Sequence, residues 1–110
     1  MSAEATLGRH LQAIGTRNVD TILEDYADNA VLFTPQATVR GREQLRQFFM
    51  QALEIFTPDV MRQFQIVRQD VDGEVAYIVY TAGSAIPLGT DTFVVRDGKI
   101  VVQTFAAQMA

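Results

Sequence analysis

Two β-rich runs flank Asp97-Gly98 near the end of the chain, and this pair is the strongest short-range signal for a two-residue hairpin turn. Pairing outward from the turn sets Val95 opposite Ile100 and Asp91 opposite Thr104. Directly paired residues share a face of the sheet, and faces alternate along each strand. One face is therefore predicted to carry an apolar set, Phe93, Val95, Ile100 and Val102. The other is predicted to carry Thr92, Val94, Arg96, Lys99, Val101 and Gln103.

Asp91 falls on the apolar face of this hairpin, which makes it the strongest functional indication in the sequence. A carboxylate pointing at an apolar interior is costly unless it is hydrogen-bonded, paired or protonated. Asp91 could line a pocket as a general acid, a general base or a hydrogen-bond donor, with its pKa raised by burial. Alternatively, it could fix the start of its strand by accepting hydrogen bonds from neighbouring threonines, of which there are three: Thr90, Thr92 and Thr104.

The first half of the chain has helical periodicity. Leu7, Leu11 and Ile14 predict a helix over residues 4–14 that ends at Gly15, with His10 on its apolar stripe. Asn18 is a typical N-cap for a second helix. Its inner face is predicted to carry Val19, Ile22, Leu23 and Tyr26, while Asp25 and Asp28 are predicted to be solvated.

A short strand is predicted over residues 30–34, followed by a loop or edge strand over 36–40. A third helix is predicted over residues 41–55, with a core-facing stripe of Leu45, Phe48, Phe49, Ala52 and Phe56. Asp72-Gly73 then predicts a second hairpin, joining residues 60–71 to 74–84. Neither face of this hairpin is cleanly polar, which indicates either a bulge or altered register, or a second face covered by another subunit.

Composition narrows the class of protein. The chain has 110 residues, 48% of them hydrophobic, and is predicted to form one domain over residues 1–110. The net charge of −4 argues against nucleic-acid binding. No cysteine and a single histidine exclude disulfides and multi-His or Cys-type metal sites. No signal peptide and no apolar run of about 18 residues is recognised, so we expect a cytoplasmic protein without a membrane span.

The order of helix, helix, strand, helix and then antiparallel strands predicts an α+β fold. The segments 7–14, 25–33, 39–43 and 90–100 together resemble a SnoaL-like domain of the nuclear-transport-factor-2-like superfamily, which includes ketosteroid isomerase and polyketide cyclases. The resemblance implies a cone-shaped, cystatin-like roll, in which three helices from the N-terminal half pack on a strongly curved, mixed but mostly antiparallel sheet. It also implies a hydrophobic pocket at the open end and a homodimer formed through the sheet.

The resemblance to ketosteroid isomerase carries over to three positions. Thr34 stands where the isomerase has its general-base aspartate, and a threonine hydroxyl cannot act as a base at neutral pH. His10 stands where the isomerase has an oxyanion-hole tyrosine, and Asp91 matches its protonated aspartate. A His–Asp pair in an apolar pocket could perform acid–base chemistry near neutral pH, although a histidine on an apolar helix face is more often a core residue.

The predicted site therefore has Asp91 and His10 as catalytic residues. Its predicted ligand-binding residues are Tyr26, Thr34, Phe33, Phe49, Tyr77 and Phe93. Tyr77 and Tyr80 lie on opposite faces of their strand, so at most one of them can line the cavity. No cofactor and no metal is predicted.

The predicted ligand is a small apolar molecule that bears one or two oxygens. The favoured function is binding of this ligand; if the chain is an enzyme, the expected reaction is cofactor-free proton transfer, as in isomerisation, dehydration or cyclisation beside a carbonyl. The alternative is a non-catalytic ligand-binding or dimerisation module that has lost the general base, and a protein-binding adaptor would require an exposed apolar patch.

Overall fold

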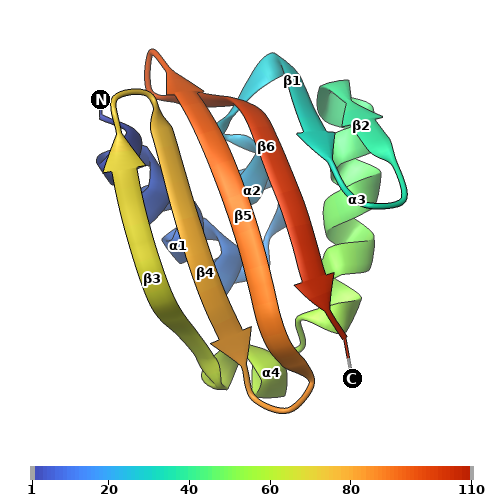
Figure 1. Cartoon of the computed structure of the whole chain (residues 1–110). Helices are drawn as coiled ribbons and strands as arrows, with labels where there is room; N and C mark the ends of the chain where they lie inside the picture. The colour runs from blue at the N-terminus through green and yellow to red at the C-terminus, as the bar shows by residue number, and fades with distance from the viewer. Residues whose placement is uncertain (1, 110) are drawn as a thin grey trace.

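Six strands form one curved sheet, and the helices cover one of its faces (Figure 1). The computed structural model describes residues 2–109. The strands are β1 (Tyr26–Phe33), β2 (Thr38–Arg40), β3 (Phe64–Asp72), β4 (Val75–Ala82), β5 (Ile86–Arg96) and β6 (Lys99–Gln108). Their order is β2-β1-β6-β5-β4-β3, and only β1 and β6 run parallel. The predicted α+β class with a mixed, mostly antiparallel sheet is confirmed.

Residues 2–109 contain α1 (Ala3–Thr16), α2 (Val19–Leu23), α3 (Gly41–Ile55) and α4 (Pro58–Arg62). Helix α3 has the predicted bounds. The prediction that α1 ends at Gly15 was wrong, because Arg17 takes the left-handed conformation with φ of 59° and closes the helix. The Arg17 guanidinium also donates to the carbonyls of Leu53 and Phe56, which ties the end of α1 to the end of α3. Helix α4 was not predicted; the Thr57 side chain caps it by accepting from the Val60 N–H.

The junction between α2 and β1 differs most from the sequence-based expectation. Tyr26 was predicted to lie on the second helix, but it begins β1 and pairs with Ile100 of β6. The Asp25 carbonyl accepts from the Ile100 N–H, so the chain enters the sheet directly after α2. Asp25 was predicted to be solvated; this was wrong, because entry into the sheet leaves it only 2% exposed.

A bulge in β6 changes the register of the opening hairpin. Val95 pairs with Ile100 as predicted, but Val94 pairs with Val102, which leaves Val101 as the extra residue. Asp91 therefore pairs with Phe105 and not with Thr104. On β5 the predicted inner face is confirmed, since Asp91, Phe93 and Val95 are all buried. On β6 the bulge moves Gln103 from the predicted outer face to the inner face, where it is buried.

A second bulge accounts for the mixed pattern of the other hairpin. Ile66 pairs with Tyr80 and Arg68 with Val79, so Val67 has no partner and is largely exposed. The inner face carries Phe64, Ile66, Ala76, Ile78 and Tyr80. The outer face keeps Val75, Tyr77 and Val79, so an interface with another subunit there remains a prediction.

Within residues 2–109, no helix combines the length and the apolar character that crossing a membrane requires.

Candidate functional site

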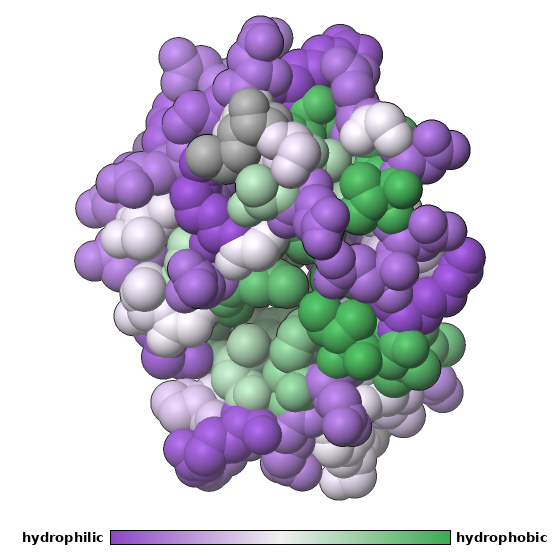
Figure 2. Space-filling view, turned by 90° about the vertical axis from the view of Figure 1, so that its left-hand side faces the viewer, coloured by the Kyte–Doolittle hydropathy of each residue, from purple (hydrophilic) through white to green (hydrophobic). Residues whose placement is uncertain are grey.

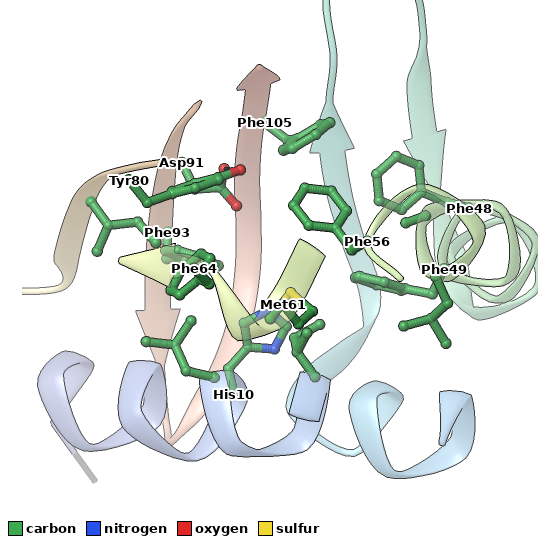
Figure 3. Close-up of a pocket in the computed structure, with 15 residues that line it drawn as sticks. His10, Phe48, Phe49, Phe56, Met61, Phe64, Tyr80, Asp91, Phe93 and Phe105 are labelled. Atoms are coloured by element: carbon green, nitrogen blue, oxygen red, sulfur yellow. Dashed lines mark hydrogen bonds between the residues drawn. The ribbon is translucent and has the colours of Figure 1, made fainter. Parts of the chain in front are cut away.

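A pocket of about 80 Å³ lies between α1, α3 and α4 and the inner face of the sheet (Figure 3). Aromatic and aliphatic side chains form most of its wall. The lining residues are His10, Leu11, Ile14, Phe48, Phe49, Ala52, Leu53, Phe56, Met61, Phe64, Ile78, Tyr80, Asp91, Phe93 and Phe105. The space-filling view from the side where β3 lies shows a hollow rimmed by hydrophobic residues (Figure 2). The polar side chains in this lining are His10 on the helical wall and Tyr80 and Asp91 on the sheet wall.

Asp91 is placed by the alternation of β5, which also buries Phe93 next to it on the same face. One carboxylate oxygen, Oδ2, accepts from the Gln103 amide Nε2 at 2.9 Å, and Oδ1 accepts from the Tyr80 hydroxyl at 3.2 Å. Asp91 as a whole residue is 8% exposed. Burial raises the pKa of Asp91 to about 7, although the hydrogen bonds from Gln103 and Tyr80 act in the opposite direction. Asp91 can therefore both give and accept a proton near neutral pH.

Tyr80 presents its hydroxyl to the pocket beside Asp91. Burial, followed by the charge of Asp91, raises the pKa of Tyr80 far above its usual value, so the hydroxyl keeps its proton. The ring packs on Phe64, with centroids 5.0 Å apart. Gly89 pairs with Tyr80 on the next strand, and a Cβ at Gly89 would collide with the ring. The missing side chain at Gly89 thus makes room for Tyr80.

His10 faces the pocket from α1, and its two ring nitrogens point at different partners. Nδ1 lies 3.6 Å from Oδ2 of Asp25, and Nε2 lies 3.5 Å from the Tyr26 hydroxyl. Phe93 and Tyr26 contact the imidazole edge-on, each with a centroid separation of 5.4 Å. The histidine is 3% exposed, so its hydrogen-bond partners come from the protein.

Asp25 is anchored from its other side by Arg9, whose Nε donates to Oδ1 at 2.6 Å. The same guanidinium donates to the Gly98 carbonyl at 2.7 Å, which ties α1 to the turn of the β5–β6 hairpin. Burial raises the pKa of Asp25, but its interactions with His10 and Arg9 outweigh that effect, and the pKa lies below its usual value. Asp25 is therefore an ionised partner for His10.

Tyr26 and Gln103 join the two polar ends of the site. The Tyr26 hydroxyl donates to Oε1 of Gln103, whose Nε2 donates to Asp91. Burial, followed by the charges of Asp91 and Asp25, raises the pKa of Tyr26 well above its usual value. A buried hydrogen-bond chain therefore runs from His10 through Tyr26 and Gln103 to Asp91, and Asp25 lies 3.6 Å from the other ring nitrogen of His10.

Several predicted site residues share the pocket. His10, Asp91, Phe49 and Phe93 all line it. Tyr26 lies behind the lining, buried against the His10 and Phe49 rings.

Three predicted ligand-binding residues lie elsewhere, and their placement in the pocket was wrong. Thr34 sits in the β1–β2 turn, where its hydroxyl accepts from the N–H groups of Gln36 and Ala37. Phe33 is 42% exposed, because the alternation of β1 turns Leu32 inward instead. Tyr77 lies on the outer face, with the Arg68 guanidinium 5.4 Å from its ring centroid.

Sequence reasoning missed three polar members of the site. Tyr80 could have been found, since it alternates with Ala76 and Ile78 on the apolar face of β4. Gln103 reaches the inner face only through the β6 bulge, which no turn signal marks. Asp25 carries no local signal of burial, because the residues that cover it come from α1 and β6.

In the part of the chain that the structure describes, no cluster of three or more histidine, cysteine, aspartate or glutamate side chains could hold a metal ion. The described polar groups of the pocket are suited to hydrogen bonding and proton transfer.

Comparison with known proteins gives a family and a fold. The sequence profile of the SnoaL-like domain matches residues 7–103. No curated protein sequence matches the chain significantly. A SnoaL-like protein of unknown function from Burkholderia thailandensis E264 is similar in structure, with a TM-score of 0.78, 21% identity, and coverage of 96% of this chain and 94% of that one.

Two further solved structures are similar in fold. SalBIII, an epoxide hydrolase/cyclase-like enzyme of pyran ring formation in the polyether salinomycin, has a TM-score of 0.78, 16% identity, and coverage of 97% of this chain and 91% of that one. A candidate ketosteroid isomerase from Kribbella flavida DSM 17836 has a TM-score of 0.73, 19% identity, and coverage of 98% and 78%.

Proposed function

This chain belongs to the SnoaL-like domain family, and from that premise we propose that it binds a small, mostly apolar molecule bearing a carbonyl or hydroxyl oxygen and moves a proton on it without a cofactor. The observation that carries the proposal is Asp91. Its carboxyl is buried in a mostly apolar wall, and burial raises its pKa to about 7. Carboxyls tuned to the working pH in this way are efficient general acids and bases.

The volume of the pocket limits the size of the ligand. A dry cavity of about 150 Å³ accommodates benzene, and this pocket has a volume of about 80 Å³. The ligand is therefore small, or its binding displaces part of the wall. Met61 is the most adaptable residue there, because an unbranched thioether has several low-energy conformations.

The polar groups suggest the reaction class. With a carbonyl oxygen within reach of Tyr80, an ionised Asp91 would take the proton from the neighbouring carbon, and the Tyr80 hydroxyl would donate to the oxygen and stabilise the negative charge that develops there. Apolar walls exclude water and strengthen these interactions. Isomerisation, dehydration or cyclisation beside a carbonyl fits this arrangement, and cyclase-like and isomerase-like proteins are among the structural relatives.

A second candidate function is binding without catalysis. Thr34, at the position of the isomerase base, is held in the β1–β2 turn and does not line the pocket. The chain would then keep the ligand pocket and have lost the base. A homodimer through the outer sheet face that carries Val75, Tyr77 and Val79 remains a proposal under either function.

The two functions are separated by turnover in a panel of small cyclic ketones and enones, followed by thermal shift and by deuterium exchange at the carbon beside the carbonyl. Asp91→Asn is expected to lower exchange at least about 100-fold, whereas Asp70→Asn on the exposed edge of β3 leaves it unchanged. If a ligand raises the melting temperature of the wild type but shows no deuterium exchange, the result supports binding without catalysis. No stabilisation by any member of the panel would overturn both candidates for this ligand class.

A further inference from the structure

We propose that Tyr26 and Gln103 are positioning residues that couple His10 to Asp91, so that the pocket holds one exchangeable proton, on His10 when Asp91 is ionised and on Asp91 when His10 is neutral. This inference deepens the proposed function, on which its catalytic use rests. The coupling itself is a property of the buried hydrogen-bond chain and can be measured without a ligand.

The starting point is the fixed tautomer of His10. In the described residues, Nδ1 of His10 and Oδ2 of Asp25 are both buried without a hydrogen-bond partner, and the two atoms face each other at 3.6 Å. Buried polar atoms without partners are costly. Since Asp25 is ionised, a hydrogen on Nδ1 is the arrangement that satisfies both atoms. Nδ1 is therefore protonated in either state of the ring, and Nε2 alone decides whether His10 is charged.

In the first state, every bond of the chain runs toward an ionised Asp91. Nε2–H of a charged His10 donates to the Tyr26 oxygen, and the Tyr26 hydroxyl donates to Oε1 of Gln103. Nε2 of Gln103 then donates to the Asp91 carboxylate. The amide orientation found in the structure is the one that this state requires.

In the second state, the direction of the chain is reversed. A protonated Asp91 donates to Oε1 of Gln103 after the amide has turned over, and Nε2 of Gln103 donates to the Tyr26 oxygen. The Tyr26 hydroxyl then donates to Nε2 of a neutral His10. The turn needs little space, because the oxygen and the nitrogen of a carboxamide are nearly the same size.

The mismatched state explains the coupling. If Asp91 is ionised and His10 is neutral, Gln103 and Tyr26 keep the first orientation, and the one Tyr26 hydrogen is already donated. The lone pair of Nε2 then faces a lone pair of the Tyr26 oxygen, and a buried acceptor is left unpaired. Ionisation of Asp91 therefore raises the affinity of His10 for a proton.

The other charged and titratable groups along the chain hold their charge near neutral pH. Arg9 on α1 and Asp25, directly before β1, form an ion pair beside the ring. Tyr26 on β1 and Tyr80 on β4 have pKa values raised by burial, so both stay protonated. His10 and Asp91 are thus the two groups of this cluster left to exchange the proton.

The test is a pH titration by NMR of the His10 ring nitrogens and the Asp91 carboxyl carbon. The chain has one histidine, so the ring signals need no assignment. In the wild type, each group is expected to show two inflections at shared pH values, and Nδ1 is expected to stay protonated throughout. In Tyr26→Phe, the second inflection of each group is expected to be lost, because the hydrogen-bond path between His10 and Asp91 is broken.

Tyr80→Phe is the matched control. It also removes a buried hydroxyl in contact with Asp91, but this hydroxyl lies outside the chain to His10. We expect it to shift the Asp91 midpoint and to keep both inflections. Gln103→Met provides a second break in the chain if Tyr26→Phe fails to fold.

The coupling would be overturned if, in the wild type, the His10 and Asp91 titration curves each showed one independent step. It would also be overturned if shared inflections persisted in Tyr26→Phe or Gln103→Met. The outcome is separable from that of the proposed function. If His10 and Asp91 share inflections but the protein exchanges no ligand proton, the coupling is supported and the catalysis is rejected. If the two groups titrate independently in a protein that does exchange ligand protons, the catalysis is supported and the coupling is rejected.

Discussion

Two buried aspartates lie at opposite ends of the same polar chain, and their pKa values shift in opposite directions. Asp25 is 2% exposed and Asp91 is 8% exposed, so both lose most of their contact with water. The pKa of Asp25 lies below its usual value, and that of Asp91 is raised to about 7. Burial disfavours the charge of both carboxylates, and for Asp25 the hydrogen bonds and charges of its neighbours outweigh that effect.

The neighbours of Asp25 are Arg9 and His10, which can be cations, whereas within residues 2–109 the hydrogen-bond donors to the Asp91 carboxyl are the neutral side chains of Gln103 and Tyr80. A cation compensates for lost hydration more fully than a neutral donor does. Asp25 therefore acts as a structural anchor, and Asp91 remains titratable where it lines the pocket. The comparison teaches that the charge of the partners, acting together with the desolvation of the carboxyl group, separates an anchor from a candidate acid–base group.

The largest expected effect is at the anchor. Asp25→Asn removes the carboxylate that contacts Arg9 and the buried His10, and we expect the free energy of unfolding to fall by roughly 3 kcal/mol, at the low end for a buried pair because the Arg9 side chain is 39% exposed. Asp28→Asn is the control, because the Asp28 side chain is 95% exposed. Denaturation in urea measures both. Equal midpoints for the two variants would show that Asp25 is not an anchor.

The next effect is the pH dependence that Asp91 imposes. Because the pKa of Asp91 is raised to about 7 in the folded protein, the folded state holds a proton that the unfolded chain has already released above its usual pKa. Stability is therefore expected to fall by roughly 2–3 kcal/mol between about pH 5 and about pH 7.

Asp91→Asn is expected to remove this fall and to be more stable than the wild type above about pH 7. Urea denaturation across this pH range measures both proteins. A wild type whose stability is flat over the range, or a variant that keeps the same slope, would contradict the raised pKa.

The smallest effect is at Gly89, beneath the Tyr80 ring. Gly89→Ala is expected to lower the free energy of unfolding by roughly 1–2 kcal/mol, since the new methyl group meets a ring already packed on Phe64. It is also expected to raise the pKa of Asp91 further, because the Tyr80 hydrogen bond that lowers it is weakened. Gly8→Ala on α1, where a Cβ meets nothing within 4 Å, is the control. An Asp91 titration that stays unchanged in Gly89→Ala would show that Tyr80 contributes little to it.

Much of the fold was predictable because its signals are local. The bounds of α3 follow from a hydrophobic stripe of period 3.6, and the inner face of β5 follows from alternation before a two-residue turn. The site was predictable only in part. The same periodicities and the family resemblance predicted the placement of Asp91, His10, Phe49 and Phe93 in the pocket. The positions of Thr34, Phe33 and Tyr77 could be found only from the observed strands and turns.

By itself, the sequence determined that Asp91 lies among apolar neighbours and that His10 faces the core from a helix. Only the tertiary structure decided what these two residues contact. The bulge at Val101 turns Gln103 inward, and the parallel pairing of Tyr26 with Ile100 carries Asp25 under α1. Both depend on pairing between segments far apart in the chain, and such pairing minimises the free energy of the whole sheet, which no local pattern encodes.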